Sequence, residues 1–360
     1  MENLVNMQRK LVPDVLEVMI GRYRILQAIH FLGPIGRRAL SGHLGLTERV
    51  LRGEVEFLGR QSLLDTASNG MMLTIEGERL LNSLEGMMKD VSGIAQLEKQ
   101  LKAVLNCSRV IIVSGDSDHE PWVKNEMGLA CVRVMEKTVK PDSIIAVTGG
   151  TTVAAVAEMM RPFKKSIHPL FVSARGGLGE QVENQANTIC AKMAERADGH
   201  HRLLHVPDPI SEESYQTLIE EPSIHEVVEL IHSAGIVIHG IGDAKTMAMR
   251  RGTAEDRWQE IESKQAIAEA FGYYFNREGQ IVHKVKTMGL SLQELFDGRT
   301  VIAVAGGESK GAAIEAYFKK GPKSILITDE GAAMKILEIK GQEKDPFNRE
   351  EYENGNESRN

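Results

Sequence analysis

The sequence predicts an α/β protein in which a small N-terminal unit of helices and one hairpin precedes a doubly wound, mainly parallel sheet. Three observations support this fold class. Short apolar runs of strand length alternate with helical stretches after about residue 106, which is typical of a doubly wound sheet. Apolar residues at helical spacing before residue 62 are followed by a hairpin signal. A chain of 360 residues is also long enough for two or more domains.

The composition is that of an ordinary globular protein, with 42% hydrophobic and 26% charged residues. The longest apolar runs have strand length, so we expect neither a membrane span nor a signal peptide. Cys107, Cys131 and Cys190 are widely spaced and fit no disulfide framework or zinc site, so we expect reduced thiols in a cytoplasmic protein. The net charge of −7 argues against a chain that coats nucleic acid nonspecifically.

Residues 22–74 predict three helices followed by a hairpin. Apolar residues recur at helical spacing over 23–31, and a short second helix over 37–44 ends at Gly45. Thr47 is placed to cap a third helix that runs to residue 60. The Asn-Gly pair at 69–70 lies between apolar runs and predicts the hairpin. This order is that of a winged helix-turn-helix, whose third helix enters the major groove of DNA.

The predicted third helix has two different faces. Leu51, Val55 and Leu58 form an apolar stripe, and charged residues occupy the opposite face. A solvated charged face without a function would give the same pattern, but the predicted wing after it favours DNA binding. We therefore expect DNA contacts from the second helix, the third helix and the wing, at Arg37, Arg38, Thr47, Arg49, Arg52 and Asn69.

A longer helical pattern over 78–105 predicts a connecting helix. Its apolar residues are spaced three and four apart, but Gly86, Gly93 and Glu98 interrupt the seam. We expect it to pair with another subunit and not to form an autonomous coiled coil. The predicted organisation is a DNA-binding domain at 1–77, a connecting and oligomerisation helix at 78–105, a ligand-binding domain at 106–340 and a disordered tail at 341–360.

The ligand-binding domain has seven candidate strands, at 110–113, 144–147, 170–172, 203–206, 236–239, 301–305 and 325–328, and a hairpin at 273–284. Ligands of open α/β sheets bind beyond the carboxyl ends of the strands. After the second strand, Gly149 and Gly150 lead into a helix that Thr151 or Thr152 is expected to cap.

This glycine turn directs backbone N–H groups and the positive end of a helix toward one point, which favours a phosphate. Arg175 follows the next strand, and Lys310 follows the Gly-Gly turn at 306–307. An ordinary βα turn explains any one of these loops. Together they predict a site for a phosphorylated small molecule.

Other functions fit the sequence less well. The glycine turns do not supply the G-x-G-x-x-G pattern of a dinucleotide site, and no P-loop occurs. On a strand, His201 and His205 would share a face, but no further ligand completes a metal site. A sugar-phosphate isomerase or lyase with Glu269 or Asp243 as its base is one alternative, and a dinucleotide-sensing repressor is another. A catalytic function does not account for a winged helix on the same chain, so we expect no catalysis.

Several long runs of the sequence resemble those of a known family: PIGRR at 34–38, ERVLRGEV at 48–55, SGDSD at 114–118, PWVK at 121–124, VTGGTT at 147–152, ARGGLG at 174–179, NQANTIC at 184–190, EAFGYYF at 269–275, and AGG at 305–307 with Lys310. In these runs the chain resembles the SorC family of bacterial sugar-responsive transcriptional regulators, and within it the regulators of glycolytic genes in Gram-positive bacteria. The resemblance extends from the N-terminus to about residue 339.

The resemblance implies a repressor of glycolytic genes that binds operator DNA as a tetramer and is relieved by fructose 1,6-bisphosphate. It implies no cofactor or metal, and an effector domain that is similar to sugar-phosphate isomerases but no longer catalyses. Carried over to this sequence, one phosphate would lie at Gly149, Gly150, Thr151 and Thr152 with help from Lys310. Arg175 would hold the other phosphate, and the rest of the pocket would be lined by Gln185, Arg250, Arg251 and Glu269.

Overall fold

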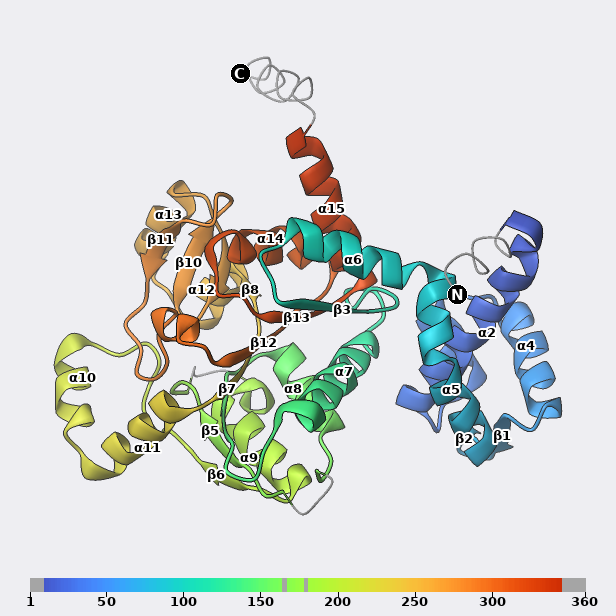
Figure 1. Ribbon diagram of the computed structural model, residues 1–360, viewed down its shortest axis with the longest axis horizontal. Helices are drawn as coiled ribbons and strands as arrows, with labels where there is room; N and C mark the ends of the chain where they lie inside the picture. The colour runs from blue at the N-terminus through green and yellow to red at the C-terminus, as the bar shows by residue number, and fades with distance from the viewer. Residues whose placement is uncertain (1–9, 164–166, 178–180, 345–360) are drawn as a thin grey trace.

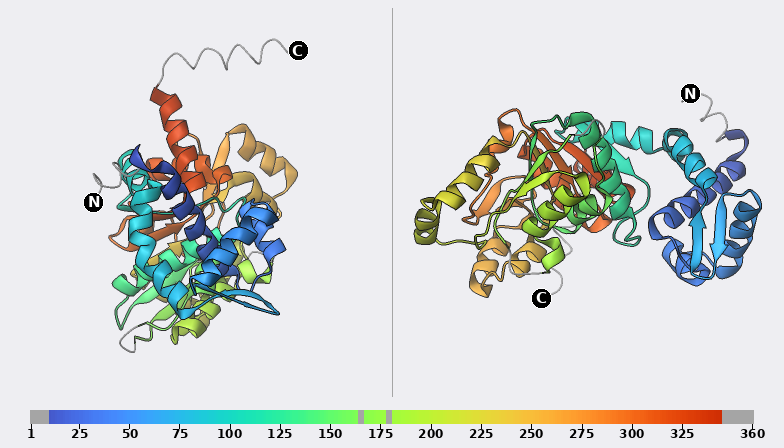
Figure 2. Two further views of the ribbon diagram at one scale, coloured as in Figure 1. Left: turned by 90° about the vertical axis from the view of Figure 1, so that its right-hand side faces the viewer. Right: turned by 90° about the horizontal axis from the view of Figure 1, so that it is seen from below.

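The computed structural model describes residues 10–163, 167–177 and 181–344 (Figure 1). The elements from α2 to α5 form an N-terminal lobe, and those from α6 to α15 form a C-terminal lobe (Figure 2). The predicted tail lies outside the described residues from residue 345 onward, and residues 341–344 belong to the last helix. Among the described helices, none combines the length and apolar composition that crossing a bilayer requires.

The N-terminal lobe contains the predicted three helices and hairpin: α2 (Pro13–Leu32), α3 (Arg37–Leu44), α4 (Glu48–Arg60), β1 (Leu64–Ala67) and β2 (Gly70–Leu73). Gly45 ends α3 in the left-handed region with φ 63°, and the N–H of Leu46 donates to the Ser41 carbonyl. Thr47 caps α4 as predicted, because its hydroxyl accepts the N–H of Val50 at 3.3 Å. The three residues of the apolar stripe of α4 are buried.

The hairpin turn differs by one residue from the prediction. Ala67 pairs with Gly70, so the two turn residues are Ser68 and Asn69. Gly70 opens β2 with φ 133°, and a Cβ there would lie 2.7 Å from the backbone nitrogen of Ile35. The backbone of Ile35 pairs with the next residue of β2. Close approach of this third segment, in addition to turn geometry, therefore requires the glycine.

The prediction of a single connecting helix over 78–105 is wrong. Two helices, α5 (Ile75–Ser92) and α6 (Ile94–Val104), are separated by Gly93 in the left-handed region with φ 85°. Helix α5 packs against α2, and α6 packs against the first strand and the last helix of the C-terminal lobe. The glycine that interrupts the apolar seam in the sequence thus ends one helix and lets the next one turn away toward the other lobe.

The main sheet of the C-terminal lobe has seven parallel strands in the order β3-β13-β12-β7-β4-β5-β6. Their bounds are Arg109–Val113 (β3), Ile144–Val147 (β4), Leu170–Ser173 (β5), His200–Arg202 (β6), Ile236–His239 (β7), Thr300–Val304 (β12) and Ile325–Asp329 (β13). Helices cover both faces of this sheet (Figure 1). The predicted doubly wound, mainly parallel fold is confirmed.

Two separate apolar cores flank the sheet. One face packs against α7 (Val123–Thr138), α8 (Thr151–Met159) and α9 (Ala186–Ala197). The other face packs against α6, α11 (Pro222–Ser233), α14 (Gly311–Lys320) and α15 (Glu330–Lys344). Both faces of the central strands are buried, which explains why those strands appear in the sequence as continuous apolar runs.

The prediction of a strand at 203–206 is wrong. The edge strand is β6, three residues earlier, and it pairs with β5 while its side chains are exposed. Leu204 and Val206 are buried, but they belong to the segment that leaves the sheet. His201 and His205 therefore do not share the face of a strand. The apolar pattern identified buried side chains, which at a sheet edge are not the residues that form backbone pairs.

A second, antiparallel sheet has the order β11-β10-β9-β8. The hairpin predicted over 273–284 is confirmed as β10 (Tyr273–Asn276) and β11 (Ile281–Lys284), whereas β8 (Gly242–Asp243) and β9 (Ala266–Ala270) were not predicted. Three further helices complete the lobe: α10 (Glu212–Ile219), α12 (Ala244–Arg250) and α13 (Glu255–Ser263).

Candidate functional site

One pocket lies beyond the carboxyl ends of β4, β5, β7 and β12, where the sequence predicted a ligand. Every pocket residue that the resemblance implied lines it: Gly149, Gly150, Thr151, Thr152, Arg175, Gln185, Arg250, Arg251, Glu269 and Lys310. Asp208, His239 and Phe271 also line it and were not predicted. The second sheet supplies one wall, because β9 carries Glu269 and α12 leads to the two arginines.

The turn after β4 is built differently from the expectation. Gly150 is the N-cap of α8 with φ 118°, and neither Thr151 nor Thr152 caps the helix. The hydroxyl of Thr152 donates instead to the carbonyl of Val304 at 2.7 Å. Because no side-chain oxygen caps α8, its first-turn N–H groups are available to an anion in the pocket.

Gly149 is needed for close packing of this turn. A Cβ at Gly149 would lie 2.7 Å from the carbonyl oxygen of Asn184, and the N–H of Gly150 donates to the same oxygen at 2.9 Å. Gln185, the next residue, is the N-cap of α9. The glycine turn thus brings the beginnings of α8 and α9 together at the pocket.

Lys310 lies in a cluster of positive charge. Burial lowers its pKa, and the neighbouring Lys124 and Arg250 lower it further, while Asp118 acts in the opposite direction. A cation with cationic neighbours is stabilised by a bound anion. Lys124 was not predicted as part of the site, although it lies in the PWVK run at 121–124.

Arg175 is buried among carboxylates. Its Nη2 lies 2.7 Å from Oδ2 of Asp208, and its Nη1 lies 3.5 Å from Oε1 of Glu269. The same Oε1 accepts from Nη2 of Arg251 at 2.7 Å and from the N–H of Gly272 at 2.6 Å. Burial alone would raise the pKa of Glu269, but the two arginines outweigh it and hold the pKa below its ordinary value.

This network of two arginines and two carboxylates is not fully hydrogen-bonded. Nε of Arg175, Nε of Arg251 and both carboxylate oxygens of Asp208 are buried and make no hydrogen bond of good geometry with the described residues. Buried polar atoms of this kind are costly unless they are satisfied. A ligand with several oxygen atoms can satisfy them.

His239 forms part of the pocket wall as a neutral residue. Burial lowers its pKa to about 4. Its Nδ1 lies 2.9 Å from the carbonyl oxygen of Gly240, and its Nε2 lies 3.3 Å from the hydroxyl of Tyr317. Both ring nitrogens are thus engaged, and the imidazole adds no charge to the pocket near neutral pH.

The six residues predicted to contact DNA are all exposed on the N-terminal lobe, on α3, on α4 and at the wing turn. Arg38 pairs with Glu48 and Arg52 pairs with Glu56, each at 3.1 Å. Exposed pairs of this kind contribute at most about 1 kcal/mol, so phosphate groups of DNA can displace them.

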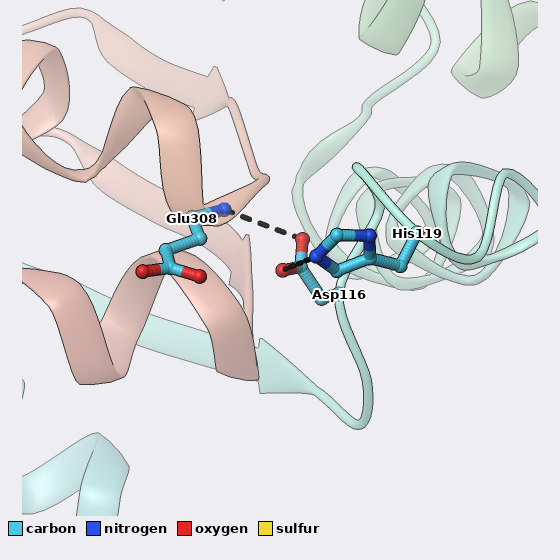
Figure 3. A group of neighbouring side chains, drawn as sticks. All are labelled: Asp116, His119 and Glu308. Carbon is cyan, nitrogen blue, oxygen red and sulfur yellow. Dashed lines mark hydrogen bonds and ion pairs between the residues drawn. The ribbon is translucent and has the colours of Figure 1, made fainter.

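Asp116, His119 and Glu308 form the group that most resembles a cation site among the described residues (Figure 3). One potential ligand atom of each lies within 4.8 Å of the others. Oδ1 of Asp116, however, already accepts the N–H groups of Asp118 at 2.9 Å and Glu308 at 3.2 Å. Because the other two side chains are exposed, we interpret Asp116 as a link between two loops and not as a metal ligand.

A winged helix-turn-helix joined to a cation-lined pocket at the carboxyl ends of a doubly wound sheet defines a ligand-responsive transcriptional regulator. Family models agree with this class: residues 18–88 match the "CggR N-terminal DNA binding domain", and residues 89–338 match the "Putative sugar-binding domain". The two matches meet within α5.

The chain is 57% identical over 338 residues to the central glycolytic genes regulator of Priestia megaterium, covering 94% of this chain and 99% of that protein. It is 56% identical over 337 residues to the Bacillus subtilis protein of the same name, with the same coverage. A solved structure titled "putative SorC family transcriptional regulator" from Enterococcus faecalis is similar, with a TM-score of 0.64 and 44% identity, covering 67% of this chain and 99% of that one.

The chain therefore belongs to the SorC family of sugar-responsive transcriptional regulators. Like its relatives, it is a DNA-binding transcriptional regulator with a sugar-binding domain, and it is not an enzyme.

Proposed function

We propose that this chain represses glycolytic genes, binds its operator as a tetramer, and releases it when fructose 1,6-bisphosphate occupies the pocket. The names of the relatives from Priestia megaterium and Bacillus subtilis support the choice of genes. The observation that carries the choice of ligand is the distribution of cationic groups in one pocket. Lys310 lies beyond the end of β12, the uncapped start of α8 lies beyond the end of β4, and Arg175 lies beyond the end of β5.

Two separated anion sites suit a ligand with a phosphate at each end. We assign one phosphate to Lys310 and the turn formed by Gly149, Gly150, Thr151 and Thr152. We assign the other to Arg175, which exchanges part of its contact with Asp208 for the phosphate. The sugar then lies against Gln185, Arg250, Arg251 and Glu269.

We assign operator contact to the domain at 1–77, through Arg37, Arg38, Thr47, Arg49, Arg52 and Asn69. The exposed face of α4 enters the major groove, and the wing contacts the adjacent backbone. Effector binding belongs to the domain at 106–340. Residues 78–105 connect the two and contribute to oligomerisation.

Operator binding titrated with sugar phosphates tests this function. Purified protein first selects its operator from a random DNA library, and the affinity is then measured at one fixed salt concentration. Fructose 1,6-bisphosphate should raise the operator Kd about tenfold or more, which corresponds to a coupling of about 1.4 kcal/mol. Fructose 6-phosphate and inorganic phosphate should have much smaller effects at the same concentration.

Two controls separate the alternatives. Consumption of fructose 1,6-bisphosphate by the purified protein, lost on Glu269→Gln, would support a catalytic function. A nucleotide that copurifies with the protein and alters operator affinity would support dinucleotide sensing. An operator affinity that no sugar phosphate changes would contradict the proposal.

A further inference from the structure

One loop joins the effector pocket to the N-terminal lobe. Residues 114–122 connect β3 to α7 and lie against the turn at 306–310, which ends in Lys310. Oδ2 of Asp118 accepts the N–H of Ser309 at 2.8 Å, and Oδ1 of Asp116 accepts the N–H of Glu308 at 3.2 Å (Figure 3). Two backbone N–H groups of this turn are thus held by carboxylates of the loop.

A third carboxylate fixes the loop and the turn to each other. Oδ2 of Asp329, at the end of β13, accepts both the N–H of Gly307 at 2.7 Å and the N–H of Ser117 at 2.8 Å. Gly307 has φ 98°, and a Cβ there would lie 2.3 Å from Oδ1 of Asp118. The loop and the turn are therefore packed tightly enough that one cannot move far without the other.

The far end of the same loop contacts α2 of the N-terminal lobe. Oε1 of Glu120 lies 2.5 Å from Nη2 of Arg24. The ring of Trp122 is stacked on that of Phe31, with centroids 5.9 Å apart and an interplanar angle of 23°. Trp122 is buried. The two contacts are seven positions apart on α2, which places them on one face of the helix.

The first turn of α7 extends this contact. Oε1 of Glu126 accepts from Nε2 of Gln27 at 2.8 Å. The residues of α2 that contact the C-terminal lobe therefore include Arg24, Gln27 and Phe31, at helical spacing. Lys124, the cationic neighbour of Lys310, lies within the same stretch of α7.

We propose that the loop at 114–122 is the element through which occupancy of the effector pocket changes the position of the N-terminal lobe. The inference rests on the proposed function, since it names how that pocket acts on DNA binding. A phosphate at Lys310 neutralises the repulsion between Lys310 and Lys124, so the turn at 306–310 and the start of α7 approach each other. Asp116, Asp118 and Asp329 pass this movement to the loop, and Glu120 and Trp122 pass it to α2.

The contact between the lobes is suited to rearrangement. A small cavity lies at this contact, lined by residues of both lobes that include Tyr23, Gln27, Glu85 and Glu126. Oε1 of Gln27 and Oε2 of Glu126 are buried without a hydrogen-bond partner among the described residues. An interface with unsatisfied polar atoms and a cavity loses less on rearranging than a closely packed one.

The coupling between effector and operator tests the inference in the full-length protein. The quantity measured is the ratio of operator Kd with and without saturating fructose 1,6-bisphosphate. Arg24→Met removes the ion pair to Glu120 but keeps the stem of the side chain, and Phe31→Leu removes the stacking on Trp122. Both should lower the ratio at least fivefold, while the Kd for fructose 1,6-bisphosphate stays within twofold of the parent.

The matched control is Glu136→Gln, which breaks the exposed ion pair between α7 and Arg161 inside the C-terminal lobe. It should leave the ratio unchanged. A second measurement uses Trp258→Phe, after which Trp122 is the only tryptophan of the chain. Addition of fructose 1,6-bisphosphate should then change the emission of Trp122, because its contact with Phe31 changes.

The outcomes distinguish the two proposals. A parent ratio of one would overturn the proposed function, and the inference with it. A parent ratio well above one that persists in Arg24→Met and Phe31→Leu, or an emission of Trp122 that the ligand leaves unchanged, would overturn the inference alone.

Discussion

Arg175 shows how a single residue can give selectivity between ligands. Its guanidinium is held by Asp208 and Glu269, so the side chain is oriented before any ligand arrives. We predict that Arg175→Ala weakens binding of fructose 1,6-bisphosphate about 10- to 100-fold, since a charge-assisted contact contributes about 1.5–3 kcal/mol. Fructose 6-phosphate, which uses only the site at Lys310, should be affected far less. Isothermal titration of both ligands measures the difference.

The variant Asp208→Asn provides the complementary measurement. It removes a negative charge that competes with the ligand for Arg175, while keeping the size of the side chain. We expect tighter binding of the bisphosphate in this variant. Equal losses for both sugars in Arg175→Ala would show that Arg175 does not form a second phosphate site.

Glu126 has the most unusual acidity at the contact between the lobes. Burial raises its pKa to about 8, and the carboxylate of Glu85 contributes in the same direction. Lys89, Arg133 and the hydrogen bond from Gln27 act in the opposite direction and are outweighed. The folded pKa lies above the unfolded one, so the stability that this group provides is present below its ordinary pKa and is lost as the pH rises through about 8.

We therefore predict a pH-dependent stability that depends on Glu126. Between pH 6 and 9 the free energy of unfolding should fall by about 2 kcal/mol more in the parent than in Glu126→Gln. Denaturant unfolding at several pH values measures this difference. Identical slopes in the two proteins would mean that Glu126 ionises normally.

At the scale of elements, α4 is the predicted recognition helix. Arg49 lies near its N-terminal end, where such helices contact bases, and Arg60 lies at its C-terminal end. Arg49→Ala should weaken operator binding by about 1–3 kcal/mol and relax its sequence preference. Arg60→Ala is the matched control and should have a smaller effect. If the two variants bind the operator equally well, α4 does not lie in the groove as proposed.

The wing depends on a glycine that its hairpin alone does not explain. Gly70→Ala places a Cβ 2.7 Å from the backbone of Ile35 and requires an unfavourable φ, so it should lower both the stability of the lobe and operator affinity. Gly21→Ala in α2 meets no atom within 4 Å and should be neutral or stabilising by up to about 1 kcal/mol. Thermal unfolding of both variants tests the pair, and equal midpoints would contradict the argument.

These elements also show which structural features local sequence patterns predict and which they do not. The cap at Thr47, the buried stripe of α4 and the central strands follow from local spacing and were predicted correctly. The register of the wing was not predicted correctly, because the constraint on Gly70 comes from the backbone of Ile35, which is distant in the sequence. Strand β9 was missed for another reason: it pairs with β10 across the two-residue turn Phe271-Gly272, which lacks the Asn-Gly or Asp-Gly signal of such hairpins.

For the pocket, the sequence identified the turns but not their surroundings. Glycines and cations after strands mark the rim, since parallel strands end on one side of a sheet. Asp208 has no local signal, and its position beside Arg175 depends on a contact between residues that are distant in the sequence. The cap expected at Thr151 or Thr152 was wrong because the hydroxyl of Thr152 donates to the carbonyl of Val304, at the end of β12, two strands away from β4.

At the scale of the whole molecule, the two lobes share one apolar core. Residues of α2 and α5 belong to the same cluster of buried side chains as those of α7 and the adjoining face of the sheet. The contacts between Phe31 and Trp122 and between Gln27 and Glu126 join residues more than ninety positions apart. No periodicity in the sequence predicts such pairs, which explains why the arrangement of the lobes required the structure.

The strand order has a consequence for synthesis on the ribosome. Strand β3, the first strand of the C-terminal lobe, lies at the sheet edge, and among the described residues it pairs only with β13, the last of the described strands. The N-terminal lobe, by contrast, is built from local contacts and can fold as soon as it emerges. We expect a nascent chain to acquire its DNA-binding surface early and its response to the effector only after residue 329 leaves the exit tunnel. Each new molecule thus has a folded DNA-binding surface before it has an effector pocket.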